Sequence, residues 1–183
     1  MKHKIIAIGD SLTFGYPFGK ARSWVGILQK EHNINIINKG INGALTLGMI
    51  QRFEIDVINE NPTHVVITGG ANDAYDFLPY GDILYNYCEM IDMAVTNDIV
   101  PIIGITPPVD EEFVERKLTK FRFKLKDYCY NKNIEIIDFY DEMVDQETGA
   151  MKEIYDFDGS HPSPKGYEVM AEVALNVIQK ILN

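Results

Sequence analysis

The stretch Ile5-Ile6-Ala7-Ile8-Gly9-Asp10-Ser11 decides how this chain is expected to fold. Its short apolar run stops at Gly9-Asp10, a pair that is typical of turns. Similar runs, each rich in Ile and Val, follow at Ile34 to Ile37, Val65 to Thr68, Val100 to Ile105 and Ile134 to Phe139. Continuous β-branched runs are typical of strands covered on both faces, as in parallel sheets. The sequence therefore predicts five buried strands.

The segments between these runs are long enough for crossover helices. Apolar residues at helical spacing predict helices over residues 23–31, 48–60, 82–96, 113–131 and, most clearly, from Pro164 onward. Ser163 is a candidate N-cap for the last helix, because Pro164 suits a first helical position. The alternation predicts an α/β protein, a three-layer α/β/α sandwich with a five-stranded, mostly parallel sheet, in a single domain over residues 1–183.

Length and composition agree with a globular protein. The chain has 183 residues, of which 46% are hydrophobic and 24% charged. A domain of this length buries enough surface to fold without a disulfide or a metal. Cys88 and Cys129 lie far apart, outside any Cys-x-x-Cys pair, and are expected to be buried free thiols. Trp24 begins an apolar helix face and is expected in the core.

The charge balance argues against several partners. The formal net charge is -10, with 27 acidic and 17 basic residues, which disfavours nucleic acid and an anionic membrane surface. The cationic cluster from Arg116 to Lys126 is interpreted as the solvated face of a helix. Ile5 to Ile8 is too short for the core of a signal peptide, so we expect a cytoplasmic protein. The sequence leaves the oligomeric state open.

Polar and glycine residues follow the predicted strands at the edge where parallel sheets bind ligands. Residues 9–13 follow the first strand, residues 38–43 the second and residues 69–73 the third. The loop from Asp156 to Pro162 precedes the last helix. These segments supply a hydroxyl, an amide, glycines, a carboxylate and an imidazole, and their convergence predicts a site there.

Ser11 is the candidate nucleophile of this site. A serine hydroxyl needs a neighbouring base, and the base needs a partner that fixes its tautomer. Among the four histidines, His161 is the best placed, since His64 opens the third strand at the opposite edge. Asp158 stands three residues earlier, within reach of the imidazole Nδ1 in a tight loop.

An acyl-transfer site also needs hydrogen-bond donors around the carbonyl oxygen, which gains charge in the transition state. The N–H groups of Ser11 and Gly43 and the side-chain amide of Asn72 are the candidates for this oxyanion hole. Such a site needs no cofactor, and the sequence contains no His-x-His or His-Glu-x-x-His pattern for a metal.

Four short motifs resemble those of the SGNH (GDSL-type) hydrolases, a family of lipases, acylhydrolases and esterases. Gly9-Asp10-Ser11-Leu12-Thr13 is similar to their first block, Gly43 to the glycine of the second, Gly70-Ala71-Asn72-Asp73 to the third, and Asp158-Gly159-Ser160-His161 to the last. The resemblance implies a flavodoxin-like sandwich and assigns the name-giving roles to Ser11, Gly43, Asn72 and His161. Ala44 departs from it, because many relatives carry Asp or Asn after the second-block glycine.

The resulting hypothesis is a serine esterase that hydrolyses small, short-chain or acetyl esters through an acyl-enzyme on Ser11. The residues expected to contact the substrate follow strand ends and are Asp10, Asp73, Tyr75, Phe77 and Pro107. The aromatic ones could equally cover the sheet edge. Two alternatives stay open: a non-catalytic flavodoxin-like domain that binds a ligand or partner protein, and an acyltransferase that uses the same triad.

Other motifs fail on their spacing. The chain has no Gly-x-Ser-x-Gly elbow of an α/β-hydrolase. Residues 15–20 are one residue short of a phosphate-binding loop, and Ala21 stands where a Mg²⁺-binding hydroxyl is required. Gly40-Ile41-Asn42-Gly43 lacks the first turn of a dinucleotide fingerprint.

Overall fold

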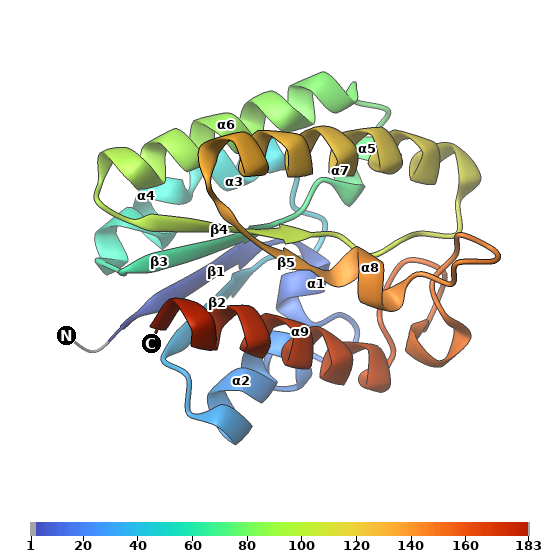
Figure 1. Cartoon of the computed structure of the whole chain (residues 1–183), viewed down its shortest axis with the longest axis horizontal. Helices are drawn as coiled ribbons and strands as arrows, with labels where there is room; N and C mark the ends of the chain where they lie inside the picture. Colours follow the sequence, from blue (N-terminus) through green and yellow to red (C-terminus); the bar gives the residue numbers. More distant parts are fainter. Residues whose placement is uncertain (1–2, 183) are drawn as a thin grey trace.

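A computed structural model describes residues 3–182 of the chain and contains one parallel sheet (Figure 1). Its strands are β1 (Ile5–Gly9), β2 (Ile36–Gly40), β3 (His64–Thr68), β4 (Val100–Ile105) and β5 (Glu135–Asp138). They pair in the order β2-β1-β3-β4-β5, every pair parallel. The predicted sheet is confirmed, although β2 lies further along the chain than the Ile34 to Ile37 run.

The α-helices cover both faces of this sheet. They are α1 (Ser11–Phe14), α2 (Trp24–His32), α3 (Thr46–Gln51), α4 (Phe53–Asp56), α5 (Ala71–Tyr75), α6 (Tyr80–Thr96), α7 (Glu112–Lys132), α8 (Phe139–Met143) and α9 (Pro164–Leu182). Short 3₁₀ turns lie at η1 (Lys20–Arg22), η2 (Ile58–Glu60) and η3 (Glu153–Tyr155).

Successive residues of β1 point into two different cores, because side chains alternate across a strand. Ile6 and Ile8 pack in the core under α3, α4, α6 and α7. Ile5 and Ala7 pack on the opposite face, with Trp24 of α2 and with α8 and α9. Figure 1 shows these two helical layers on either side of the sheet. The three-layer prediction is therefore confirmed, and Trp24 is fully buried as expected.

Serine side chains cap the N-termini of α2 and α9, and the predicted cap at Ser163 is confirmed. The Ser23 hydroxyl accepts the Gly26 N–H and begins α2. The Ser163 hydroxyl accepts the Gly166 N–H at 3.1 Å, and α9 begins at Pro164. Such a cap contributes about 1 kcal/mol, since it satisfies an N–H that has no intrahelical partner.

The prediction of one continuous helix over residues 48–60 is wrong. The segment is divided into α3, α4 and η2, and the first break falls at Arg52, which has φ -104° and ψ 1°. The Arg52 guanidinium donates to the carbonyl oxygens of Lys39 and Gly9, at the ends of β2 and β1. These tertiary hydrogen bonds accompany a break that helical periodicity alone does not reveal.

Two further expectations need correction. Cys129 is buried, but Cys88 is only half-buried. Within the cationic cluster, Arg122 is buried rather than solvated, because its guanidinium donates to the Glu115 carboxylate and to the carbonyl oxygens of Thr106 and Pro107. Among residues 3–182, no helix combines the length and the apolar character needed to cross a membrane.

Candidate active site

Ser11 lies directly beyond the carboxyl end of β1. The Asp10 carboxylate accepts the Leu12 N–H at 2.9 Å and caps the single turn of α1, which Ser11 begins. Gly9 permits this turn because a Cβ there would lie 2.2 Å from Thr13 Oγ1. Ser11 is only 8% exposed. The sheet therefore holds its hydroxyl at a fixed position.

His161 lies in the loop before α9, opposite Ser11. Its Nε2 is 3.0 Å from Ser11 Oγ. The loop is closed on itself: Phe157 N–H donates to the His161 carbonyl oxygen, and Gly159 N–H donates to the Asp156 carboxylate. These local bonds bring the imidazole to the serine across a separation of 150 residues.

Asp158 occupies the other side of the imidazole. Both of its carboxylate oxygens are 3.0 Å from His161 Nδ1, and Oδ1 also accepts the His161 N–H at 2.9 Å. A carboxylate at Nδ1 favours the tautomer in which Nε2 is free to accept the serine proton. The structure thus brings the three predicted residues together in the order serine, histidine, aspartate.

Gly43 and Asn72 border the same hydroxyl from the ends of β2 and β3. Gly43 has φ +73°, a conformation that favours glycine. Its turn is closed by a bond from Ala44 N–H to the Ile41 carbonyl oxygen, and the Ala44 carbonyl oxygen accepts from Asn72 Nδ2 at 3.1 Å. Two hydrogen bonds of the Ala44 backbone, one of them from the Asn72 side chain, therefore stabilise the turn that the Ala44 side chain cannot stabilise.

These residues surround a pocket of about 210 Å³. It is lined by Ser11, Tyr16, Asn42, Gly43, Asn72 and His161. The Tyr16 and His161 rings are 4.6 Å apart, and the Tyr167 hydroxyl donates to the Tyr16 carbonyl oxygen. Asn42 was not singled out from the sequence, although its place beside Gly43 in a strand-end loop was a usable signal.

Comparisons with known proteins agree with this arrangement. Residues 7–169 match the model of the GDSL-like lipase/acylhydrolase family. The chain belongs to that family.

Two relatives are similar over most of the chain, and a third over a smaller part. A protein described as lipolytic, of the G-D-S-L family, from Desulfitobacterium hafniense is 32% identical with a TM-score of 0.89, over 95% of this chain and 98% of its own. An arylesterase of Vibrio mimicus is 25% identical over 98% of this chain and 90% of its own length. The lipoprotein YqeF of Bacillus subtilis is 39% identical over 79 residues, which are 38% of this chain and only 32% of YqeF.

Two carboxyl groups of the family motifs, on the residues that follow Gly9 and Asn72, are buried. Asp10 and Asp73 are fully buried, and neither lines the pocket, so the expected contact with substrate does not fit their positions. Burial raises the pKa of Asp10 to about 7, and the nearby Asp73 carboxyl adds to the rise. Burial also raises the pKa of Asp73, whose carboxylate accepts the Thr46 N–H at the start of α3. Asp73 thereby fixes the segment that follows Gly43.

The other three predicted contact residues lie around the site. The Tyr75 hydroxyl is 2.6 Å from Ser160 Oγ and joins α5 to the histidine loop. Phe77 is 71% exposed and outside the pocket lining. Pro107 is buried, and its carbonyl oxygen accepts from Arg122. Among residues 3–182, no cluster of three His, Cys, Asp or Glu residues could hold a metal ion.

Proposed function

We propose that this protein is a serine esterase that hydrolyses small carboxylic esters through an acyl-enzyme on Ser11. The observation that carries the proposal is the chain of contacts from Ser11 Oγ to His161 Nε2 and from His161 Nδ1 to Asp158, each at 3.0 Å. Membership of the GDSL-like lipase/acylhydrolase family supports it, as do relatives named arylesterase and esterase TesA.

In the first half of the reaction, Ser11 Oγ attacks the ester carbonyl carbon while His161 Nε2 takes the hydroxyl proton. The C–O bond to the alcohol then breaks, and the imidazolium returns the proton to the leaving oxygen. Asp158 stabilises the imidazolium and is not itself protonated. In the second half, His161 activates water, which attacks the acyl-enzyme and releases the acid.

The tetrahedral oxyanion would accept hydrogen bonds from Ser11 N–H, Gly43 N–H and Asn72 Nδ2. The two backbone N–H groups donate to no acceptor within residues 3–182. Asn72 Nδ2 carries a second hydrogen besides the one bonded to Ala44. Losing one such donor typically costs about 10²- to 10³-fold in kcat.

The decisive experiment replaces the nucleophile. Ser11→Ala should lower the hydrolysis of 4-nitrophenyl acetate by at least about 10³-fold, while the thermal unfolding midpoint stays close to that of the wild type. A fluorophosphonate probe should label one peptide, containing Ser11, in the folded protein and none in the denatured protein. Full activity in Ser11→Ala, or labelling of another residue, would refute the mechanism.

The size of the pocket supports a short acyl group. A cavity of about 210 Å³ is below the range of about 300–1,000 Å³ that is typical of drug-sized ligands. With 4-nitrophenyl esters of increasing chain length, kcat/KM should therefore be highest for the shortest acyl chains. Product analysis with added acceptor alcohols distinguishes hydrolysis from acyl transfer, since a transferase would form a new ester instead of free acid.

A further inference from the structure

A second hollow lies between the first turns of α6 and α7, and we call it the α6–α7 pocket. It has a volume of about 450 Å³ and is lined by Pro79, Tyr80, Phe113, Arg116, Lys117 and Lys120. Three of these residues are cations, two are aromatic and none is acidic. This local excess of positive charge stands out in a chain whose net charge is -10.

An exposed aromatic residue stands beside this pocket. The ring of Phe77 is 5.5 Å from that of Phe113, and Lys117 Nζ lies over both rings, 5.2 and 4.9 Å from their centres. Phe77 is 71% exposed and has φ +62°, which is strained for a bulky side chain. Strain of this kind concentrates at ligand-binding sites, where surrounding contacts maintain it.

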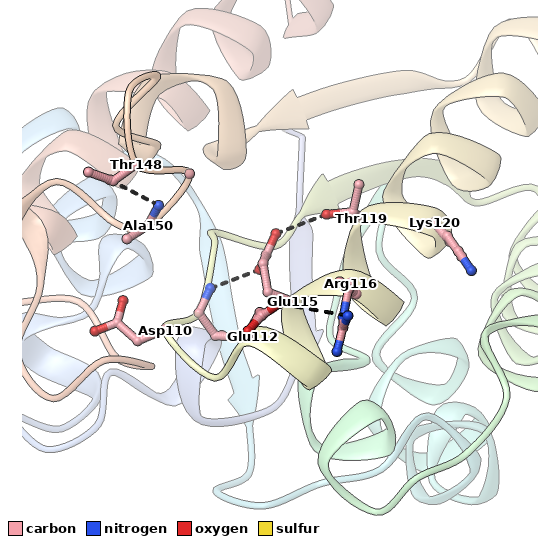
Figure 2. A pocket seen from close by; sticks show the side chains of 10 residues that line it. Asp110, Glu112, Glu115, Arg116, Thr119, Lys120, Thr148 and Ala150 are labelled. Carbon is pink, nitrogen blue, oxygen red and sulfur yellow. Dashed lines mark hydrogen bonds and ion pairs between the residues drawn. The ribbon is translucent and has the colours of Figure 1, made fainter.

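The neighbouring hollow in Figure 2 has balanced charges. Arg116 and Lys120 line both hollows. In the neighbouring one, the Glu115 carboxylate is neutralised by Arg122, and Glu112 lies 3.7 Å from Arg116. Figure 2 shows Lys120 directed away from Asp110. Arg116 is thus partly balanced by Glu112, whereas Lys117 and Lys120 form no ion pair within residues 3–182, so the unpaired positive charge of the α6–α7 pocket comes from these two lysines.

Segments beside the α6–α7 pocket contact the histidine loop of the candidate active site. Phe77 comes two residues after Tyr75, whose hydroxyl contacts Ser160 beside His161. Asp110, in the hollow next to it, donates its N–H to the Gly159 carbonyl oxygen. Helix α6 begins at Tyr80 without a side-chain cap, so the positive end of its dipole lies at the rim of the pocket.

We infer that the substrate is an ester with a negatively charged group distant from its carbonyl, and that the α6–α7 pocket binds this group. The inference rests on the proposed esterase function and names its substrate class. Arg116 and Lys120 supply charge-assisted hydrogen bonds, which are about twice as strong as neutral ones. The rings of Phe77 and Phe113 hold Lys117 beside the pocket through cation–π contacts.

Matched esters test the inference. The acyl arm compares 4-nitrophenyl half-esters of linear dicarboxylic acids with neutral 4-nitrophenyl alkanoates of equal length. The alcohol arm compares acetylated glycerol phosphate with acetylated glycerol, and hydrolysis is measured as the release of acid. The natural substrate carries its charge on either the acyl or the alcohol part, and one arm matches it. In that arm, the double variant Arg116→Ala/Lys120→Ala should raise the KM of the charged ester about tenfold and leave the KM of the neutral ester unchanged.

Lys124→Ala is the matched control, because Lys124 is an exposed cation of the same helix that lines neither hollow. It should leave the KM of both esters unchanged. Equal effects of the double variant on charged and neutral esters in both arms, or equal effects of Lys124→Ala, would overturn the inference.

A binding measurement separates the two proposals. Calorimetry with adipate and with glycerol phosphate, at low ionic strength, should detect binding to wild type and Ser11→Ala and its loss in Arg116→Ala/Lys120→Ala. Failure of the esterase proposal would appear as no hydrolysis of any ester, with this binding retained. Failure of the pocket proposal would appear as hydrolysis that does not depend on the charge of the ester, with no binding that depends on Arg116 and Lys120.

Discussion

The two sides of the candidate active site are built differently. Ser11 lies in a segment that is almost completely buried, from Asp10 to Thr13, and Asn38 of β2 donates its side-chain N–H to the Thr13 carbonyl oxygen. His161 lies in a loop whose Asp158 and His161 side chains are 36% and 24% exposed. That loop is held mainly by its own hydrogen bonds, with further contacts from Asp110 and Tyr75.

This difference separates stability from activity. An atom added beside Ser11 disturbs the packing of β1 with its neighbours, so it should lower the free energy of unfolding. A change in the histidine loop alters the position of the imidazole and leaves the core intact. Substitutions that add bulk beside Ser11 should therefore destabilise the protein, whereas those in the histidine loop should inactivate a folded one.

The largest expected effect comes from Asp158. Asp158→Ala should lower kcat by about 10²- to 10⁴-fold without shifting the thermal unfolding midpoint, because the imidazole loses the group that orients it. Asp158→Asn is compared with Asp158→Ala, because the asparagine Oδ1 still accepts the His161 N–H but carries no charge. If both variants unfolded at lower temperature than the wild type, the proposed separation would be incorrect.

Gly9→Ala tests the opposite side. The added Cβ would lie 2.5 Å from the Thr68 carbonyl oxygen and 2.2 Å from Thr13 Oγ1, so the free energy of unfolding should fall by about 3 kcal/mol. Gly48→Ala is the control, because a Cβ there meets nothing within 4 Å. In urea titrations the control should be unchanged or more stable by up to about 1 kcal/mol.

The titration of Asp10 makes the free energy of unfolding depend on pH. Burial raises the pKa of Asp10 from 3.8 to about 7, so between these values the folded state keeps a proton that the unfolded state has lost. Its contribution to stability is present at low pH and is lost as the pH rises toward 7, with a slope of at most about 1.4 kcal/mol per pH unit.

Asp10→Asn removes this titration and keeps an oxygen that can accept the Leu12 N–H. The stability of the variant relative to the wild type should therefore increase from about pH 5 to about pH 8. Urea titrations at the two pH values measure the change. A constant difference between the two proteins would mean that Asp10 does not titrate in this range.

The smallest effect is expected in the histidine loop at Gly159, which has φ +83° and no room beside Asp110 Oδ2. Gly159→Ala should lower kcat about tenfold, by shifting the loop, with little loss of stability. Gly149→Ala has a similar φ, +77°, but meets nothing within 4 Å and lies outside the pocket lining. The control should thus share the backbone strain but retain full kcat. Equal losses of kcat in both variants would contradict the explanation by a shift of the histidine loop.

The sequence predicted the sheet well because each strand is a continuous Ile- and Val-rich run. It also predicted which residues follow the strands, and parallel packing brings Ser11, Gly43 and Asn72 to one edge. The break at Arg52 was missed, since it coincides with hydrogen bonds to Gly9 and Lys39, far away in the chain. The α6–α7 pocket was missed for the same reason, because its lining comes from two helices. The single-domain assignment over residues 1–183 stays a prediction.

The separation of Ser11 and His161 has a consequence for the newly made protein. During synthesis the nucleophile emerges before its base, which follows 150 residues later. Helix α9, which comes after His161, packs on α2 and completes the core on that face. A nascent chain that has not yet reached His161 therefore holds a serine without its base, and hydrolysis should begin only after His161 and α9 have been made.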